Sequence, residues 1–360
     1  MSGRHRRASR SRATVAAAVA AALLIIAAVA FAVIRSRTGP PSPPIAASGR
    51  STSASTSPTP SPLPKQDGNA PKERDERRGK LVIHATGDVN LDPNYISTYR
   101  SEGYGYAWSG LDGLFKDDSL TIVNLECSVA TGGVPNPKDF VFQGDPDALP
   151  FMRKAGVEVA NMGNNHSQDY GKDAMLETRE NLIDERIAPV GAGKDAKEAN
   201  EPAMFTIDGW KVAVLGFGGV YPSLDWFATQ NNPGMANGDD IDSMVKAVKR
   251  ADRKADLVIV MIHWGVELQT KPEPEDVERG HAMVDAGADM IFGGHAHRLQ
   301  PMEMYRGKPI FWSLGNFVWP NHGGEGSVTG VAEVTVSKGG DEKARLLPAT
   351  IVDHGHPVLR

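Results

Sequence analysis

Residues 257–297, LVIVMIHWGVELQTKPEPEDVERGHAMVDAGADMIFGGHAH, contain the pattern that decides the fold. Leu257–Ile262 is an apolar run rich in β-branched residues, which predicts a buried strand, and Met290–Phe292 predicts a second strand. Between them, Pro274–Ala286 has the spacing of an amphipathic helix and is followed by Gly287, a residue at which helices often end. Strands that alternate with helices in this way predict a layered α/β domain.

The same alternation begins at Leu81 and continues through the rest of the chain. Further strands are expected at Leu81–Thr86, Leu120–Leu125, Val157–Asn161 and Val212–Phe217. Further helices are expected at Ala148–Ala155, Lys172–Glu185 and Asp240–Lys254. Near the end of the chain the pattern predicts a hairpin, Met302–Tyr305 with Ile310–Leu314, and antiparallel strands at Gly330–Val336 and Ala344–Val352. We therefore expect one domain at residues 81–352, with mixed sheets packed face to face and helices outside, and a solvated tail at residues 353–360.

Composition and charge exclude several classes of protein. The chain has 360 residues, of which 40% are hydrophobic and 23% are charged, so most of it should fold around a core. Because Cys127 is the single cysteine, the chain can form neither an internal disulfide nor a thiolate metal cluster. Residues 1–50 carry eight arginines and no acidic residue, which leaves 31 basic and 44 acidic residues, a net charge of −13, for residues 51–360. This acidic balance argues against nucleic acid as the partner.

The N-terminal region predicts attachment to a membrane. Val15–Ile34 is an unbroken run of twenty apolar residues, long enough to cross the hydrocarbon core. Five arginines lie in the basic segment 1–14 and only two follow the run closely, which predicts a cytoplasmic N-terminus and an extracytoplasmic remainder. We therefore expect an uncleaved, single-pass signal anchor in the cell membrane, with a cleaved signal peptide as the alternative because Ala28–Ala30 resembles a cleavage site. Residues 35–80, rich in Pro, Ser and Thr and then in charge, predict a disordered linker.

Five polar clusters follow predicted strands, at the positions where α/β sheets present their ligands. They are Thr86–Asn90, Asn124–Glu126, Gly163–His166, His263–Gly265 and Gly293–His297. Buried charges cost several kcal/mol unless they are paired or bind metal, so one shared metal site would explain the clusters together. Oxygen and nitrogen ligands without sulfur suit Mn, Fe, Zn or Mg, and a bridging carboxylate would allow two divalent ions.

Six motifs, in this order, carry a resemblance to a known family. They are GDVNL at 87–91, NLE at 124–126, NNHSQDYG at 164–171, HWGVE at 263–267, GGHAHRLQP at 293–301 and SLGNF at 313–317. From Leu81 to Ile351 the chain resembles the CapA/PgsA-type proteins of capsule and poly-γ-glutamate biosynthesis. That family in turn resembles the calcineurin-like metallophosphoesterases, which implies a four-layer α/β/β/α sandwich with a two-metal site.

The resemblance also implies roles for individual residues. The implied metal ligands are Asp88, Asn90, Glu126, Asn165, His263, His295 and His297. Asp88 and His297 would serve one ion, Asn165, His263 and His295 the other, and Glu126 would bridge the two. His166 would stabilise or protonate the leaving oxygen, and Asp169 could orient His166.

Two of these positions depart from the pattern of the phosphoesterases. Asn90 stands where those enzymes have a histidine, and Glu126 stands where they have a bridging aspartate. A neutral amide is a weaker ligand than imidazole, and a glutamate bridge is longer than an aspartate bridge, so the affinity for metal or the spacing of the ions would differ.

Two functions of different classes fit the sequence. The first is a metal-dependent, phosphoesterase-like hydrolase that is anchored in the membrane and acts in the biosynthesis or processing of capsule or poly-γ-glutamate polymer. The alternative is a non-catalytic assembly or polymer-binding subunit with the same fold. In either case the expected partners are the membrane, an anionic cell-surface polymer or its precursor, and other subunits of a synthase complex.

Overall fold

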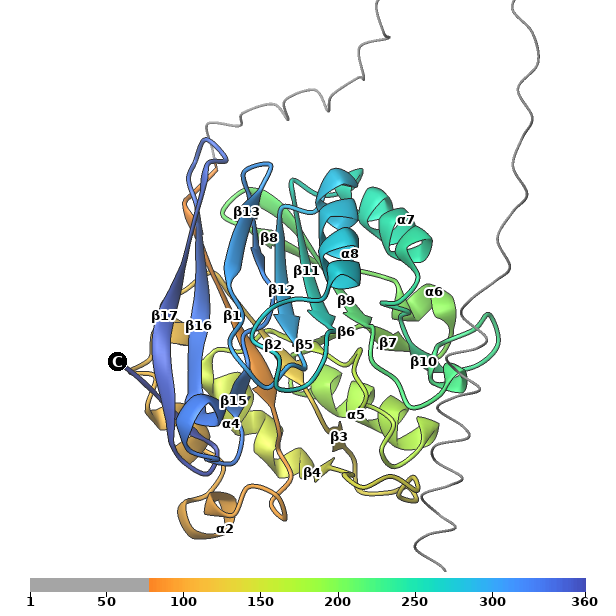
Figure 1. The fold of residues 1–360 in the computed structure, drawn as a ribbon, viewed down its shortest axis with the longest axis vertical. Coiled ribbons are helices and arrows are strands. Elements are labelled where there is room, and N and C mark those ends of the chain that lie inside the picture. The colour runs from red at the N-terminus through yellow and green to blue at the C-terminus, as the bar shows by residue number, and fades with distance from the viewer. Residues whose placement is uncertain (1–77) are drawn as a thin grey trace, which may run out of the picture. The chain divides into compact units, whose positions relative to one another are not determined.

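Strand β1, Leu81–Val89, lies inside an eight-stranded mixed sheet (Figure 1). The computed structural model describes residues 78–360 of the chain. The strand order is β18-β17-β16-β1-β2-β5-β6, and β15 also pairs with β1. β1 is parallel to β2 and β15 and antiparallel to β16. The bounds of the other strands are β2 Leu120–Leu125, β5 Val159–Asn161, β6 Ala188–Val190, β15 Asn316–Val318, β16 Val328–Val336, β17 Glu342–Asp353 and β18 His356–Leu359.

A second sheet has six strands in the order β13-β14-β12-β11-β9-β8. Its four central strands are parallel, and both edge strands are antiparallel to their neighbours. The bounds are β8 Ala203–Ile207, β9 Trp210–Gly218, β11 Leu257–His263, β12 Met290–Gly294, β13 Met302–Tyr305 and β14 Lys308–Phe311. Two small two-stranded sheets pair β3 Ser128–Val129 with β4 Gln143–Gly144, and β7 Ala192–Gly193 with β10 Gly234–Met235.

The two large sheets pack on each other through alternate side chains. Ile83 and Ile122 of the first sheet share one buried cluster with Val214 and Ile259 of the second. Because side chains on a strand alternate between faces, each sheet has a second face to cover. Helices cover both outer faces, as Figure 1 shows.

The helices divide between the two sheets. Helices α2 to α5 share a buried cluster with the first sheet, and α7 and α8 share another with the second. Their bounds are α2 Thr98–Glu102, α3 Tyr106–Ser109, α4 Leu149–Ala155, α5 Lys172–Asp184, α6 Ala196–Ala199, α7 Ile241–Asp252 and α8 Pro274–Asp285. Short 3-10 turns lie at Leu114–Lys116, Pro146–Ala148, Leu224–Trp226 and Gly324–Ser327. The expected α/β class with mixed sheets is confirmed.

The C-terminal end differs from expectation. Residues 353–360 were expected to form a solvated tail, but His356–Leu359 forms β18 and pairs antiparallel with β17. Residues 354 and 355 make a tight turn between the two strands, in which Gly355 adopts a φ of 72°. A four-residue strand is too short to show the alternation of apolar and polar residues that marks a strand. Without that signal, the glycine between the two strands was not recognised as part of a hairpin turn.

Within residues 78–360, none of the helices is both long enough and apolar enough to cross a membrane. The expected basic segment 1–14, the span at 15–34 and nearly all of the linker at 35–80 lie outside the described residues.

Candidate metal centre

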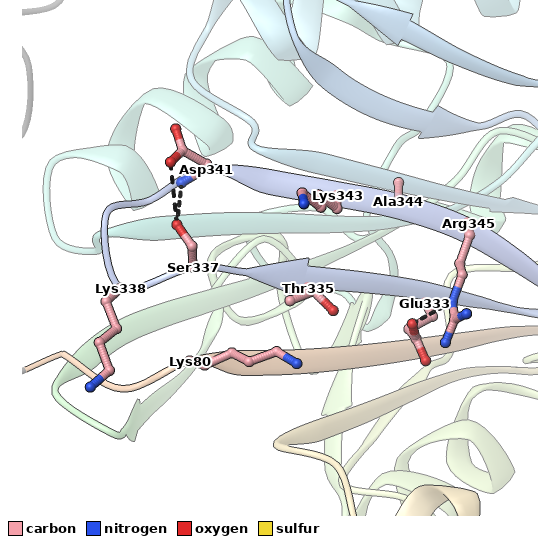
Figure 2. Close-up of a pocket in the computed structure, with 9 residues that line it drawn as sticks. All are labelled: Lys80, Glu333, Thr335, Ser337, Lys338, Asp341, Lys343, Ala344 and Arg345. Atoms are coloured by element: carbon pink, nitrogen blue, oxygen red, sulfur yellow. Dashed lines mark hydrogen bonds and ion pairs between the residues drawn. The ribbon is translucent and has the colours of Figure 1, made fainter.

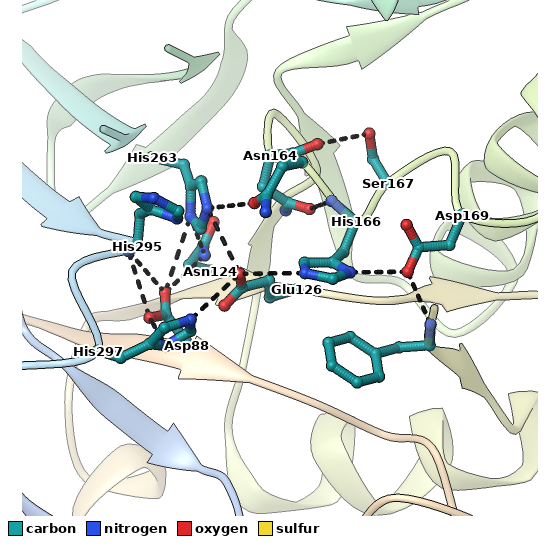
Figure 3. Close-up of polar contacts among 12 residues, drawn as sticks. Asp88, Asn124, Glu126, Asn164, His166, Ser167, Asp169, His263, His295 and His297 are labelled. Atoms are coloured by element: carbon teal, nitrogen blue, oxygen red, sulfur yellow. Dashed lines mark hydrogen bonds and ion pairs between the residues drawn. The ribbon is translucent and has the colours of Figure 1, made fainter. Parts of the chain in front are cut away.

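The carboxyl ends of four strands from both sheets bring the polar clusters together (Figure 3). Asp88 lies near the end of β1, and Glu126 directly follows β2. In the second sheet, His263 is the last residue of β11, and His295 directly follows β12. Parallel strands present these ends at one edge, so side chains far apart in the sequence meet there.

Glu126 lies at the middle of this group and is fully buried. Its Oε1 is 3.4 Å from Nε2 of His263, 3.9 Å from Nε2 of His166 and 4.0 Å from Nε2 of His297. Among the described residues, neither carboxylate oxygen has a hydrogen-bond partner. Burial, and then the neighbouring charge of Asp88, raises the pKa of Glu126 well above its usual value. A buried carboxylate without a partner is costly and is relieved by a bound cation.

Two overlapping groups of side chains have the geometry to hold metal. One is Glu126 with His263 and His295, the other is Asp88 with Glu126 and His297, and within each group the ligand atoms lie within 4.8 Å of one another. Glu126 belongs to both, which is the position that the family resemblance implied for a bridging carboxylate. The donors are oxygen and nitrogen only, because Cys127 is buried in the core near the Leu91 amide. The residues therefore fit a divalent cation.

The histidines differ in their electrostatic environment. Burial, and then the nearby His297, lowers the pKa of His295 to about 3, and burial also lowers the pKa of His263 well below its usual value. Burial is the largest influence on the pKa of His297 and lowers it, but the hydrogen bond and charge of Asp88, the hydrogen bond to Asn316 and the charge of Glu267 together outweigh burial and raise the pKa. His295 and His297 adopt φ angles of 85° and 50°, the left-handed region that side chains seldom enter. Such strain is typical of functional sites.

Asn165 contacts a residue of the centre, whereas the Asn90 side-chain oxygen accepts a hydrogen bond from a nearby backbone amide. The Asn165 Oδ1 lies 2.7 Å from Nε2 of His263. The Oδ1 of Asn90, its one ligand atom, accepts the N–H of Asp92 at 2.8 Å. Among the described contacts, none joins Asn90 to the other expected ligands.

His166 contacts Asp169 through Nδ1 and faces Glu126 through Nε2. Its Nδ1 is 2.7 Å from Oδ2 of Asp169, which also accepts the N–H of Phe142 at 2.7 Å. Because a carboxylate is an acceptor, this contact requires the hydrogen on Nδ1, which leaves a lone pair on the Nε2 that faces Glu126. Burial lowers the pKa of His166, although Asp169 opposes the shift.

Lys138 completes this arrangement and was not found by sequence reasoning. Its Nζ lies 2.6 Å from Oδ1 of Asp169 and 3.3 Å from Nδ1 of His166, and it donates to the backbone oxygen of Asn165 at 2.5 Å. It lies in an irregular stretch between β3 and β4 and belongs to none of the motifs. No sequence signal pointed to it.

Two further residues near the centre lie in the six motifs but were not among the expected ligands. Asn316, in the SLGNF motif, has its Oδ1 2.7 Å from Nδ1 of His297. Glu267, in the HWGVE motif, is exposed and groups with His295 and His297 as a third set of candidate ligands. A pocket of about 230 Å³ opens beside them, with aromatic walls that include Tyr95, Phe142 and Trp319 and with His166, His297 and Arg298 in its lining.

A family model described as "Bacterial capsule synthesis protein PGA_cap" matches residues 82–321. The chain belongs to this family. The chain is 32% identical over 248 residues to the "Capsule biosynthesis protein CapA" of Bacillus anthracis, a match that covers 67% of this chain and 60% of that protein. It is 31% identical over 252 residues to the "PGA biosynthesis protein CapA" of Bacillus subtilis strain 168, covering 69% of this chain and 66% of that one.

A third relative comes from another genus. It is a "Probable polyglutamine synthesis accessory protein" of Mycobacterium tuberculosis, 31% identical over 209 residues, or 55% of each chain. The chain thus spans less than two thirds of the length of the curated relatives described here. The resemblance carried by the six motifs is confirmed.

Proposed function

We propose that this protein is a membrane-anchored, extracytoplasmic, metal-dependent hydrolase of the phosphoesterase type, acting in the biosynthesis or processing of an anionic capsule or poly-γ-glutamate polymer. Family membership and the names of the relatives support the biological context. The apolar run at 15–34 supports the anchor. One observation carries the chemistry: both oxygens of the buried Glu126 lack a hydrogen-bond partner among the described residues, although three imidazole nitrogens lie within 4.0 Å of one of them.

The residues that would hold divalent ions are Asp88, Glu126, Asn165, His263, His295 and His297. When bound, such ions polarise a phosphoryl or carbonyl oxygen and stabilise the negative charge that develops on it. The chain supplies the rest of the chemistry through His166. Asp169 and Lys138 fix the orientation of its ring, so that Nε2 faces the centre and can exchange a proton or hydrogen bond with the reacting oxygen.

The pocket beside the centre supports the entry of a substrate. Phe142 packs 4.4 Å from His166 and Trp319 packs 4.8 Å from His297, between ring centroids. These rings restrict the motion of both imidazoles and keep one side of the site apolar. Arg298 lies at the pocket and offers a cation to an anionic substrate.

Metal content tests this proposal before any substrate is known. The full-length chain, purified in detergent, is analysed for bound metal together with Glu126→Ala and His295→Ala. Matched controls are Glu201→Ala and His281→Ala, because Glu201 is exposed and His281 contacts Glu303 and Tyr305, away from the centre. We expect both site variants to lose metal and both controls to retain it. Full retention by the two site variants would remove the basis for the proposed activity.

A second candidate is a non-catalytic assembly or polymer-binding subunit, and the geometry of Asn90 favours it. The Asn90 side-chain oxygen accepts the Asp92 amide, so a local turn already uses one of the two lone pairs that this expected ligand could offer a metal. If the wild-type chain binds metal but hydrolyses neither small phosphoesters nor γ-glutamyl polymers, this second function replaces the first.

A further inference from the structure

A second hollow of about 800 Å³ lies at the amino-terminal end of β1 (Figure 2). Lys80, in its lining, directly precedes β1, whereas Asp88 of the metal centre lies near the other end of the same strand. Eight residues of extended strand separate the two by about 26 Å. We call this hollow the basic groove, and define it by Lys80, Lys338, Lys343 and Arg345, which line it together with Glu333 and Asp341.

The basic groove is formed on the outward face of β16 and β17. Val334, Val336 and Ala344 point between the two large sheets. Side chains next to them in the sequence must therefore point the other way, and Glu333 lies opposite Arg345 in the register while Thr335 lies opposite Lys343. Lys343 and Arg345 are exposed, so helices do not cover this part of the sheet.

Positive charge in the basic groove is in excess, and three of the four cations that define it are unpaired in the described part of the chain. Glu333 is neutralised locally, because its Oε1 accepts from Nε of Arg345 at 2.6 Å and its Oε2 lies 3.4 Å from His84. Lys80, Lys338 and Lys343 are exposed, and within residues 78–360 none of them forms an ion pair. Residues 51–360 carry a net charge of −13, so this groove reverses the sign of the surrounding chain.

We infer that the basic groove binds an extended polycarboxylate chain, an inference that rests on the proposed role in making an anionic polymer. One exposed ion pair contributes little, so a single small anion would be held weakly. A chain that carries many carboxylates engages several of these cations at once, and the binding then strengthens through effective concentration. The groove is a hollow on the outward face of β16 and β17, a shape that accepts a chain segment better than the broad surface of a bilayer.

The test measures the binding of fluorescently labelled poly-γ-glutamate to the full-length protein in detergent. The groove variant is Lys80→Gln, Lys338→Gln and Lys343→Gln combined. The matched control combines Lys246→Gln, Lys249→Gln and Arg250→Gln, three exposed cations of α7 on the far side of the second sheet. The N-terminal arginines are the same in every protein, so they cannot account for a difference. We expect the groove variant to bind roughly tenfold more weakly, the control to bind like wild type, and added salt to reduce the difference.

Three results would overturn the inference. Equal binding by wild type and the groove variant would show that these lysines do not hold the polymer. If the control variant loses as much polymer binding as the groove variant, binding depends on the total charge of the protein and not on the groove. If instead the groove variant loses binding to vesicles of anionic lipid while it still binds the polymer, the surface faces a membrane.

Metal analysis of the same proteins separates this inference from the proposed function. The groove variant should keep its metal, because the lysines lie at the far end of β1 from Asp88. Polymer binding through the groove without bound metal in the wild type would contradict the hydrolase and leave the groove intact. Bound metal without groove-dependent polymer binding would contradict the groove inference and leave the proposed hydrolase intact.

Discussion

The side-chain nitrogen of Asn124 lies 2.8 Å from Oδ1 of Asp88, although 36 residues separate the two in the sequence. The parallel pairing of β1 and β2 places them in register. The same nitrogen lies 2.9 Å from Nδ1 of His263, so one amide contacts a carboxylate of the first sheet and an imidazole of the second. Asn161 donates to the Oδ1 of Asn124 at 2.9 Å and fixes the orientation of that amide.

Replacing Asn124 by alanine should therefore weaken metal binding without removing a ligand. We expect the affinity for divalent metal to fall about 10- to 100-fold, since residues that orient ligands commonly have effects of this size. Titration calorimetry of the metal-free protein with a divalent metal measures this affinity. Asn232→Ala is the control, because Asn232 is exposed and its side chain contacts only Thr229 in the described contacts. An unchanged affinity in Asn124→Ala would show that the amide does not position the ligands.

Much of the candidate site was predictable because its residues end strands. Asp88, Glu126 and His263 each close an apolar run, and parallel strands bring such ends to one edge. The two histidines of the GHAH sequence, His295 and His297, were expected near these residues because they follow the end of another parallel strand. The bounds of most of the expected strands and helices followed from periodicity, which records the face that each segment buries. The second arm of the hairpin, expected at Ile310–Leu314, instead lies at Lys308–Phe311, and β8 was not expected.

The remainder depends on contacts that periodicity does not record. Lys138 reaches Asp169 from an irregular stretch, and no local pattern tells where such a stretch crosses the sheet. The direction of the Asn90 side chain is set by the backbone N–H of Asp92, two residues away, which competes with a metal for the same oxygen. β18 was missed because its pairing with β17, rather than its own four residues, defines it.

Removal of metal should reverse the effect of Glu126→Gln on stability. Without metal, the wild-type protein buries a carboxylate that has no partner and lies near Asp88, and the amide of the variant avoids that cost. With metal, the wild type gains about 2.7 kcal/mol at a free metal concentration 100 times the dissociation constant. We expect the variant to have the higher melting temperature in EDTA and the wild type to have the higher one in excess metal. Parallel shifts of both proteins on adding metal would contradict a role for Glu126 as ligand.

The ion pair between Lys138 and Asp169 should contribute to folding. Asp169 is fully buried, and Lys138→Met would leave it with only the His166 ring and the Phe142 amide as described partners. We expect the free energy of unfolding to fall by about 1–3 kcal/mol, because a buried charge loses its counterion. The double variant with Asp169→Asn should cost less than the sum of the two single changes. Urea denaturation measures all three, with the exposed Lys194→Met as control; additive effects would show that the two residues are not coupled.

Lys308 should make stability depend on pH in the alkaline range. Its Nζ lies 2.7 Å from Oδ1 of Asp289 and 2.6 Å from Oε1 of Glu342. Burial opposes the charged ammonium, but the two carboxylates outweigh it and raise the pKa above the usual 10.5. A raised pKa means that the folded state binds the proton more tightly than the unfolded state, so the stabilisation is complete below about pH 10 and is lost as the pH rises through the folded value. Lys308→Met should therefore lower the free energy of unfolding by about 1–2 kcal/mol at pH 8, and the difference from wild type should shrink above pH 11. Denaturant titrations at pH 8 and above pH 11 measure the difference in the free energy of unfolding between wild type and variant. A difference that is the same at both pH values would show that the ammonium charge of Lys308 is not what stabilises its contacts with the two carboxylates.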